Sequence, residues 1–151
     1  MSKSKFLTGL SIVAGVAVIA SGAAVAQDAI AKRKALMKAV GGATKTGSQM
    51  VKGEIPFDAA KAAESMNTIA KGWAEFATLY PKGTETGGET TASPKIWETF
   101  ADFDAQGKKM AADAAKAATA AAGGADAFKA AFGDVTKSCK SCHDVYRVKK
   151  N

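Results

Sequence analysis

Hydrophobic side chains recur at alternating steps of three and four residues along four long stretches of the chain. This spacing puts them on one face of an α-helix, and no stretch shows the every-second-residue alternation of a β-strand. The first helix is expected from about Asp28 to Val51. The second begins after Asp58, a suitable N-cap, and stops at Pro81. The stripe positions are Ile30, Arg33, Met37, Val40 and Thr44 in the first helix and Ala62, Met66, Ile69, Trp73, Phe76 and Tyr80 in the second.

Two more helices follow a polar loop over residues 82–92 that is rich in Gly, Thr and Glu. Ser93 is the expected N-cap and Pro94 the first helical residue of the third helix, which Gly123-Gly124 ends. The fourth helix begins near Asp126. The stripes are Ile96, Phe100, Phe103, Gly107, Met110, Ala114 and Ala117 in the third helix and Phe128, Ala131, Phe132, Val135, Cys139, Cys142 and Tyr146 in the fourth. Four amphipathic helices with mostly short links predict an all-α protein, an antiparallel four-helix bundle.

The first 26 residues have the pattern of a targeting segment. Two lysines precede an apolar run over residues 6–20, and the small-residue sequence Ala24-Val25-Ala26 follows as a cleavage site. The alternative is an uncleaved membrane anchor, for which the apolar run is short. We therefore expect a cleaved signal peptide over 1–26, one domain over 27–151, and no membrane attachment after cleavage.

The charge of the chain is moderately positive. Without the two lysines of the expected signal peptide, 19 basic residues stand against 14 acidic ones. No basic stripe interleaved with aromatic side chains is present, so we expect no nucleic-acid partner. The excess favours docking to an acidic redox partner, while an ordinary solvated surface is the plainer interpretation.

The pentapeptide Cys139-Lys140-Ser141-Cys142-His143 contains both cysteines and the only histidine of the chain. This is the attachment signature of a c-type haem, in which two thiols bond the vinyl groups and the imidazole binds the iron. A structural zinc site needs four ligands, and a redox C-x-x-C belongs near a βαβ pattern. A disulfide would leave His143 without a role. We expect haem c bound near the C-terminal helix, attached outside the bacterial cytoplasmic membrane and hence in the periplasm.

The second axial ligand of the iron cannot be another histidine, so a methionine thioether is the usual choice. The mature chain offers Met37, Met50, Met66 and Met110. Met66 and Met110 belong to core stripes, and Met50 is near the end of its helix. Met37 lies well inside the first helix, on the same face as Arg33. Core filler is the alternative for any stripe methionine.

Beyond the haem motif, the chain resembles the class II c-type cytochromes, that is cytochrome c′ and its low-spin relatives of the cytochrome c-556 type. The resemblance covers residues 28–150. It is carried by Arg33-Lys34-Ala35-Leu36-Met37, by Ser93-Pro94-Lys95-Ile96-Trp97 and by the run from Cys139 to Arg147. It implies a four-helix bundle with His143 on the proximal side of the haem and the first helix as the distal wall.

The resemblance also assigns roles on the distal side. Position 37 holds the distal ligand or the residue that blocks that side, and some five-coordinate relatives have an unligated methionine there. The loop 83–87 and the ending 146–150 look more like the low-spin subgroup, so Met37 is expected to bind the iron. Arg33 is a candidate contact for a haem propionate, which suits its forked donors, with a solvated arginine as the alternative.

The function expected from these features is low-spin electron transfer in the periplasm with His143 and Met37 as axial ligands. The partners would be redox proteins of a bacterial respiratory or photosynthetic chain. The alternative is a five-coordinate cytochrome c′ that binds nitric oxide or carbon monoxide. No catalytic acid–base pair or nucleophile is evident, so no enzyme activity is expected. Whether two copies form a homodimer stays open.

Overall fold

The computed structural model describes residues 17–149. Its helices are α1 (Ala17–Val51), α2 (Ala59–Phe76), α3 (Lys95–Glu98), α4 (Phe100–Ala120) and α5 (Ala125–Tyr146), with a 3₁₀ turn at Ala121–Gly123. The part of the chain described contains no strand, only an isolated bridge between Ala92 and Arg147. The all-α prediction is confirmed.

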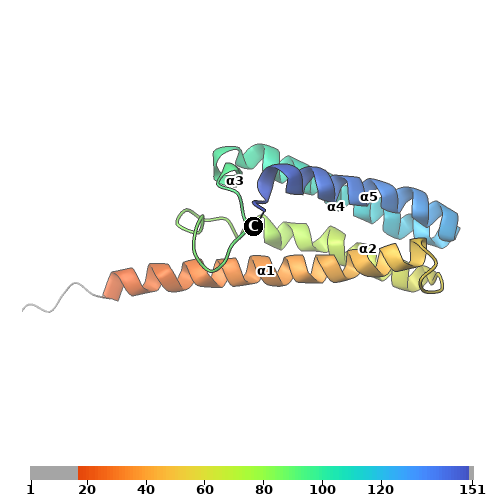
Figure 1. Cartoon of the computed structure of the whole chain (residues 1–151), viewed down its shortest axis with the longest axis horizontal. Helices are drawn as coiled ribbons and strands as arrows, with labels where there is room; N and C mark the ends of the chain where they lie inside the picture. Colours follow the sequence, from red (N-terminus) through yellow and green to blue (C-terminus); the bar gives the residue numbers. More distant parts are fainter. Residues whose placement is uncertain (1–16, 150–151) are drawn as a thin grey trace, which may run out of the picture.

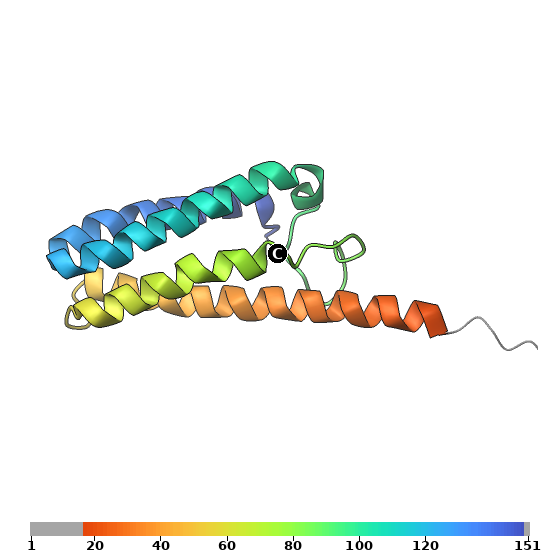
Figure 2. The ribbon, with the colours of Figure 1, turned by 180° about the vertical axis from the view of Figure 1, so that it is seen from behind.

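The four long helices form a bundle of two antiparallel pairs (Figures 1 and 2). Helix α1 lies beside α2, and α4 lies beside α5. Helix α2 also packs on α4, and α5 on α1, which closes the ring of four. The N-terminal end of α1 extends beyond the rest of the bundle, next to the loop that connects α2 with α3 (Figure 1).

Helix α2 begins as expected and ends early. The Asp58 carboxylate accepts a hydrogen bond from the Lys61 backbone N–H at 3.0 Å, which confirms the cap. The helix stops at Phe76, not at Pro81, because the backbone N–H of Thr78 bonds the carbonyl three residues before it, as in a 3₁₀ turn. The Thr78 hydroxyl donates to the same carbonyl, that of Glu75, at 2.7 Å.

The expected third helix is broken in two, which corrects the prediction of one continuous element. Thr99 adopts φ −130° and ψ 49°, outside the helical region, and separates α3 from α4. Its hydroxyl donates to the Lys95 carbonyl at 3.0 Å and lies 3.3 Å from the Tyr146 hydroxyl. The bend leaves Phe100, a predicted core residue, 40% exposed, whereas Phe103 is buried.

A glycine allows α2 and α4 to approach closely. A Cβ on Gly107 would lie 2.0 Å from two ring carbons of Trp73, far inside van der Waals contact. The Trp73 indole N–H donates to the Asp104 carboxylate at 3.2 Å, which holds the ring flat against α4. Glycine in mid-helix costs about 1 kcal/mol relative to alanine, so the close approach must offset that loss.

A buried polar cluster joins α4 to α5 directly before the haem motif. The Ser138 hydroxyl and the Lys109 ammonium each donate to the same Asp113 carboxylate oxygen at 2.6 Å. Asp113 and Ser138 are 8% and 6% exposed. Burial raises the pKa of the Asp113 carboxyl, but these two hydrogen bonds outweigh burial and hold the pKa below its ordinary value. The cluster fixes the rotation of α5 relative to α4.

The expected signal peptide falls mainly outside the described residues, since 1–16 are not among them. Helix α1 runs without a break from Ala17 past the expected cleavage site after Ala26. Between residues 17 and 149, no helix is both long and apolar enough to span a membrane. The division of the chain at residue 26 stays a prediction.

Candidate haem-binding site

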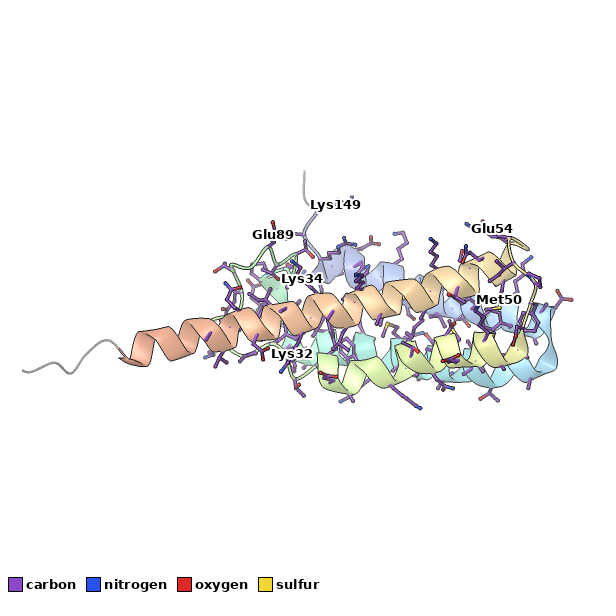
Figure 3. All side chains as sticks on the ribbon, turned by 90° about the horizontal axis from the view of Figure 1, so that it is seen from below. Lys32, Lys34, Met50, Glu54, Glu89 and Lys149 are labelled. Carbon is purple, nitrogen blue, oxygen red and sulfur yellow. The ribbon has the colours of Figure 1, made fainter. Side chains whose placement is uncertain are left out.

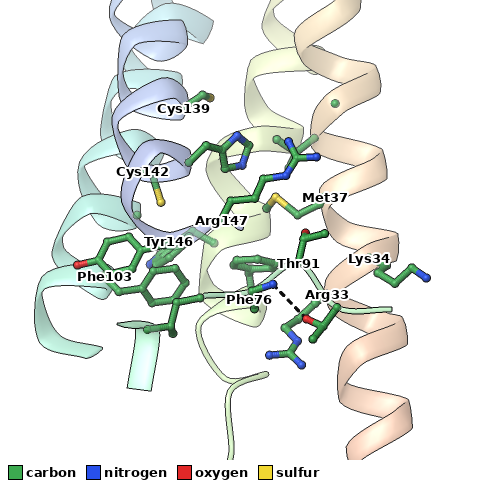
Figure 4. Close-up of a pocket in the computed structure, with 18 of the residues that line it drawn as sticks. Arg33, Lys34, Met37, Phe76, Thr91, Phe103, Cys139, Cys142, Tyr146 and Arg147 are labelled. Carbon is green, nitrogen blue, oxygen red and sulfur yellow. Dashed lines mark hydrogen bonds between the residues drawn. The ribbon is translucent and has the colours of Figure 1, made fainter. Parts of the chain in front are cut away.

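A cavity of about 830 Å³ lies between α1 and α5, with residues of α2 and α4 behind it (Figure 4). This volume falls within the range of pockets that hold organic ligands. Figure 4 shows Met37 and Arg33 entering from α1, and Cys139 and Cys142 from α5. Exposed residues at its edge, such as Lys38, leave the cavity open to solvent on one side.

The α5 wall carries the complete haem motif. Cys139, Cys142 and His143 occupy helix positions i, i+3 and i+4, so all three side chains share one face and line the cavity. Both cysteines are half-buried free thiols. Burial, and then the neighbouring Cys139, raises the pKa of Cys142 to about 11, so the thiol is neutral at physiological pH.

The imidazole of His143 is suited to bind a metal. Partial burial, and then the charge of Arg147, lower the pKa of His143, while Asp144 acts in the opposite direction. A lowered pKa favours the neutral imidazole, which is the form that ligates iron. Arg147 follows the end of α5 and lines the same cavity.

The α1 wall has an apolar part beside its basic residues Arg33, Lys34 and Lys38. Met37, Val40, Gly41 and Thr44 line the cavity from this helix. The Thr44 hydroxyl donates to the Val40 carbonyl at 2.8 Å, so its proton is engaged within the helix. The wall that faces α5 therefore presents a thioether, methyl groups and an open glycine position.

Of the other methionines, Met110 also lines the cavity, from α4, which the sequence did not predict. Its place in a core stripe concealed this, because a cavity wall and a solid core show the same periodicity. Met50 and Met66 are buried in the core and do not line the cavity. Met37 is the methionine that α1 contributes, and the resemblance had assigned α1 to the distal wall.

Arg33 is buried at the loop end of the cavity and is 5% exposed. One Nη donates to the Thr84 carbonyl at 2.7 Å, and the guanidinium stacks on the rings of Tyr80 and Trp97 at 4.7 and 5.5 Å. Its Nε and other Nη have no hydrogen-bond partner among the described residues. Buried donors of a charged group are costly to leave unpaired, so an anionic group of a ligand is the partner they fit. A haem propionate meets this requirement.

Aromatic rings form the back of the cavity. The sequence predicted these rings as core residues, and in the structure they belong to the core and also line the cavity. The lining rings are Trp73, Phe76, Tyr80, Phe103 and Tyr146. Phe103 contacts Tyr80 at 5.0 Å and Tyr146 at 5.1 Å between centroids, each edge to face. These residues offer a flat macrocycle an apolar surface.

The loop before α3 covers one end of the cavity, which no sequence pattern indicated. Thr90, Thr91 and Ala92 line the cavity. Ala92 pairs with Arg147, and the Val148 N–H donates to the Thr91 carbonyl at 2.9 Å. These backbone contacts tie the loop to the end of α5, next to the haem motif.

Comparison with known proteins identifies the family of the chain. The family model described as Cytochrome C' matches residues 28–147. Cytochrome c′ of Rhodopseudomonas palustris is 46% identical over 124 residues, covering 80% of this chain and 82% of that one. A solved structure of cytochrome c′ from that species aligns with a TM-score of 0.76 and 43% identity, covering 82% of this chain and 98% of that one.

Two further relatives differ in what their names say. Cytochrome c-556 of Agrobacterium fabrum is 40% identical over 123 residues, covering 79% of this chain and 80% of that one. A variant of cytochrome c prime from Alcaligenes xylosoxidans, solved as a nitric oxide complex, aligns with a TM-score of 0.74 and 34% identity, covering 83% of this chain and 97% of that one.

Proposed function

Because the chain belongs to the cytochrome c′ family, we propose that it binds a small gas molecule, such as nitric oxide, at its covalently attached haem c. The family comprises haem proteins that transfer electrons or bind gases. When bound, the haem would supply an iron that changes between ferric and ferrous states and can bind a diatomic ligand. The sequence alone favoured electron transfer. The similarity to cytochrome c′ now favours gas binding.

The chain's own residues divide the work of holding the haem. Cys139 and Cys142 would form the two thioether bonds, and His143 would bind the iron from the α5 side. Their shared helix face supports this arrangement. Arg33 would pair with a propionate through its two unpartnered nitrogens.

The apolar part of the α1 wall is the observation that carries the gas-binding proposal. An uncharged diatomic molecule needs space and a dry wall, and it needs no proton donor. Met37, Val40 and Gly41 supply such a wall, and the Thr44 hydroxyl is engaged elsewhere. None of these three residues is an acid or base that could activate a substrate, which supports a binding protein over an enzyme.

A second function is supported by Met37 itself. Met37 lines the same cavity as His143, from the facing helix. If it bound the iron, the haem would be six-coordinate and low-spin, and the protein would be an electron carrier. The similarity to the relative named cytochrome c-556 supports this second function.

The visible spectrum of the ferrous protein, with and without carbon monoxide, tests the two functions. Gas binding predicts a high-spin ferrous spectrum that shifts fully when carbon monoxide is added. Ligation by Met37 predicts a low-spin spectrum that resists carbon monoxide and a ferric near-infrared band of thioether-to-iron charge transfer. The second pattern would overturn the proposal.

Two methionine variants test whether Met37 determines the spin state of the haem. Met37→Leu keeps the volume of the side chain and removes the sulfur, so it should leave a five-coordinate wild-type spectrum almost unchanged. If Met37 is a ligand, the same variant should become high-spin and take up carbon monoxide. Met110→Leu is the matched control, since Met110 lines the cavity from α4 and should be neutral in either case.

The pairing of Arg33 with a haem propionate is tested by the reduction potential of the haem. Replacing Arg33 by leucine removes a buried positive charge. This removal favours the ferric state and should lower the reduction potential of the haem by some tens of millivolts. Arg33→Lys keeps the charge and should retain most of the potential. Equal potentials in the wild type and in Arg33→Leu would show that the side chain does not contact the haem.

Export completes the proposal. The lysines, apolar run and Ala24-Val25-Ala26 of the first 26 residues support cleavage and a periplasmic location. Mass spectrometry of the protein from a periplasmic extract should give a chain that begins at Gln27. A chain that starts at Met1 and remains with the membrane would contradict this.

A further inference from the structure

The basic residues of this chain are concentrated in two segments, and the fold brings these segments to the two sides of the cavity. Residues 29–51 of α1 contain five basic side chains and no acidic one. Residues 135–149, at the end of α5, contain four basic side chains and one acidic one. The connecting part, residues 52–134, carries nine basic and twelve acidic residues and is therefore net negative. The positive charge is concentrated in the two segments that flank the cavity.

In each segment some of the basic residues line the cavity. Lys34, Lys38 and Lys45 are spaced four and seven residues apart, and Lys34 and Lys38 line the cavity. Lys140 lies on α5, and Arg147, which directly follows the end of that helix, lines the cavity from the other side. Basic residues of both segments therefore border the same cavity.

These charges are mostly unneutralised. Lys34 is 3.6 Å from Glu89, and Lys140 pairs with Asp144. In the part of the chain that the structure describes, Lys38 and Lys45 form no ion pair. Figure 3 shows Lys34, Glu89 and Lys149 in the same part of the molecule. Exposed Val145 and Val148 add apolar surface on the α5 side.

We propose that this border, formed by Lys34, Lys38, Lys140, Arg147 and Lys149, is the docking surface for an acidic redox protein that exchanges electrons with the haem. Positive charge around a cavity opening attracts an acidic surface and orients it toward the cofactor. A concave opening with an apolar patch and a charged rim fits a protein partner better than a flat membrane surface. The inference holds for either state of the distal site, because both proposed functions require the iron to be reduced.

The rate of oxidation by ferricyanide, a small anion, reports the electrostatic potential at this opening. In the reaction one electron leaves the ferrous haem and converts ferricyanide to ferrocyanide, and no bond breaks. The double variant Lys34→Glu with Lys38→Glu should slow this reaction about tenfold at low ionic strength. The cationic oxidant tris(phenanthroline)cobalt(III) should react faster with the same variant. Both effects should vanish at 1 M salt, where the screening length is about 3 Å.

Lys116→Glu with Lys129→Glu is the matched control, since it changes the net charge equally on exposed residues outside the cavity lining. It should change either rate less than twofold. An equal effect of both double variants would show that only net charge matters and would overturn the proposal. A slow rate that persists at 1 M salt would also overturn it, because the cause would then be structural damage.

The protein partner is tested with an eight-residue polyglutamate peptide and with phosphatidylglycerol vesicles. Chemical shifts of the holoprotein should move for residues 34–38 and 140–149 on peptide addition, and the Lys34→Glu/Lys38→Glu variant should lose this response. Co-sedimentation with the vesicles at physiological salt, without a peptide response, would assign the surface to lipid and refute the proposal. None of these outcomes depends on whether Met37 binds iron, so failure here is distinct from failure of gas binding.

Discussion

Removing the haem should cost this protein its close packing, although its helices would largely persist. The perturbation is Cys139→Ser with Cys142→Ser, which deletes both attachment points and yields haem-free chain. The cavity then lies between α1 and α5, with no protein side chains to fill it.

The size of the effect follows from the cavity volume. At roughly 24 cal/mol per Å³, a dry void of 830 Å³ costs about 20 kcal/mol, more than the 5–15 kcal/mol by which a typical domain is stable. Because the cavity is open on one side, water enters and lowers this cost. Even a quarter of it, about 5 kcal/mol, equals the whole stability of a marginal domain. The haem-free bundle must therefore relax, and we expect α1 to move most because the cavity separates it from α5.

Hydrogen exchange and near-ultraviolet circular dichroism measure this relaxation. Helix α1 should exchange faster than α4 and α5, which pack on each other along a solid core that includes Ala114, Phe128 and Val135. The near-ultraviolet signal of Trp73 and Trp97 should be weak, and heating should give a broad transition. The haem-loaded wild type is the control. A sharp, cooperative melt of the haem-free protein with native protection in α1 would refute the reasoning.

Two other predictions concern the packing around the site. Gly107→Ala should destabilise the protein by about 1–3 kcal/mol and perturb the haem spectrum, because its Cβ would overlap the Trp73 ring; Gly133→Ala on α5, where a Cβ meets nothing within 4 Å, should be neutral or stabilising in the same urea titration. Asp113, whose pKa is lowered in the folded protein, stabilises the fold above its unfolded pKa of about 3.9, and this contribution disappears as the pH falls through the lower folded pKa. The free energy of unfolding should therefore decline less steeply between about pH 5 and pH 2 in Asp113→Asn than in the wild type.

Local sequence signals were sufficient for most of the fold. The Asp58 cap and the Gly123-Gly124 stop act over a few residues, so they are visible in the sequence and confirmed in the structure. The haem motif is also local, since helix spacing alone puts its cysteines and histidine on one face. Family membership, haem c and the four-helix bundle followed from these signals.

Long-range contacts explain what the sequence did not predict. The break at Thr99 accompanies a hydroxyl contact with Tyr146, 47 residues away. The burial of Arg33 rests on the Thr84 carbonyl, 51 residues away. The lining role of Met110 was hidden for a related reason: periodicity identifies the inward face of a helix, but it cannot tell whether that face meets another side chain or a cofactor.

The loop between α2 and α3 affects whether Met37 can reach the haem iron. How closely Met37 approaches the iron depends on where α1 stands relative to α5. Helix α1 is held laterally by α2 and at its loop end by the Arg33–Thr84 hydrogen bond and the Lys34–Glu89 pair. The same loop is bonded to the end of α5 through the Thr91 carbonyl. A short polar segment thus joins the two walls of the cavity, and its length and contacts, together with the residue at position 37, set whether the thioether reaches the metal.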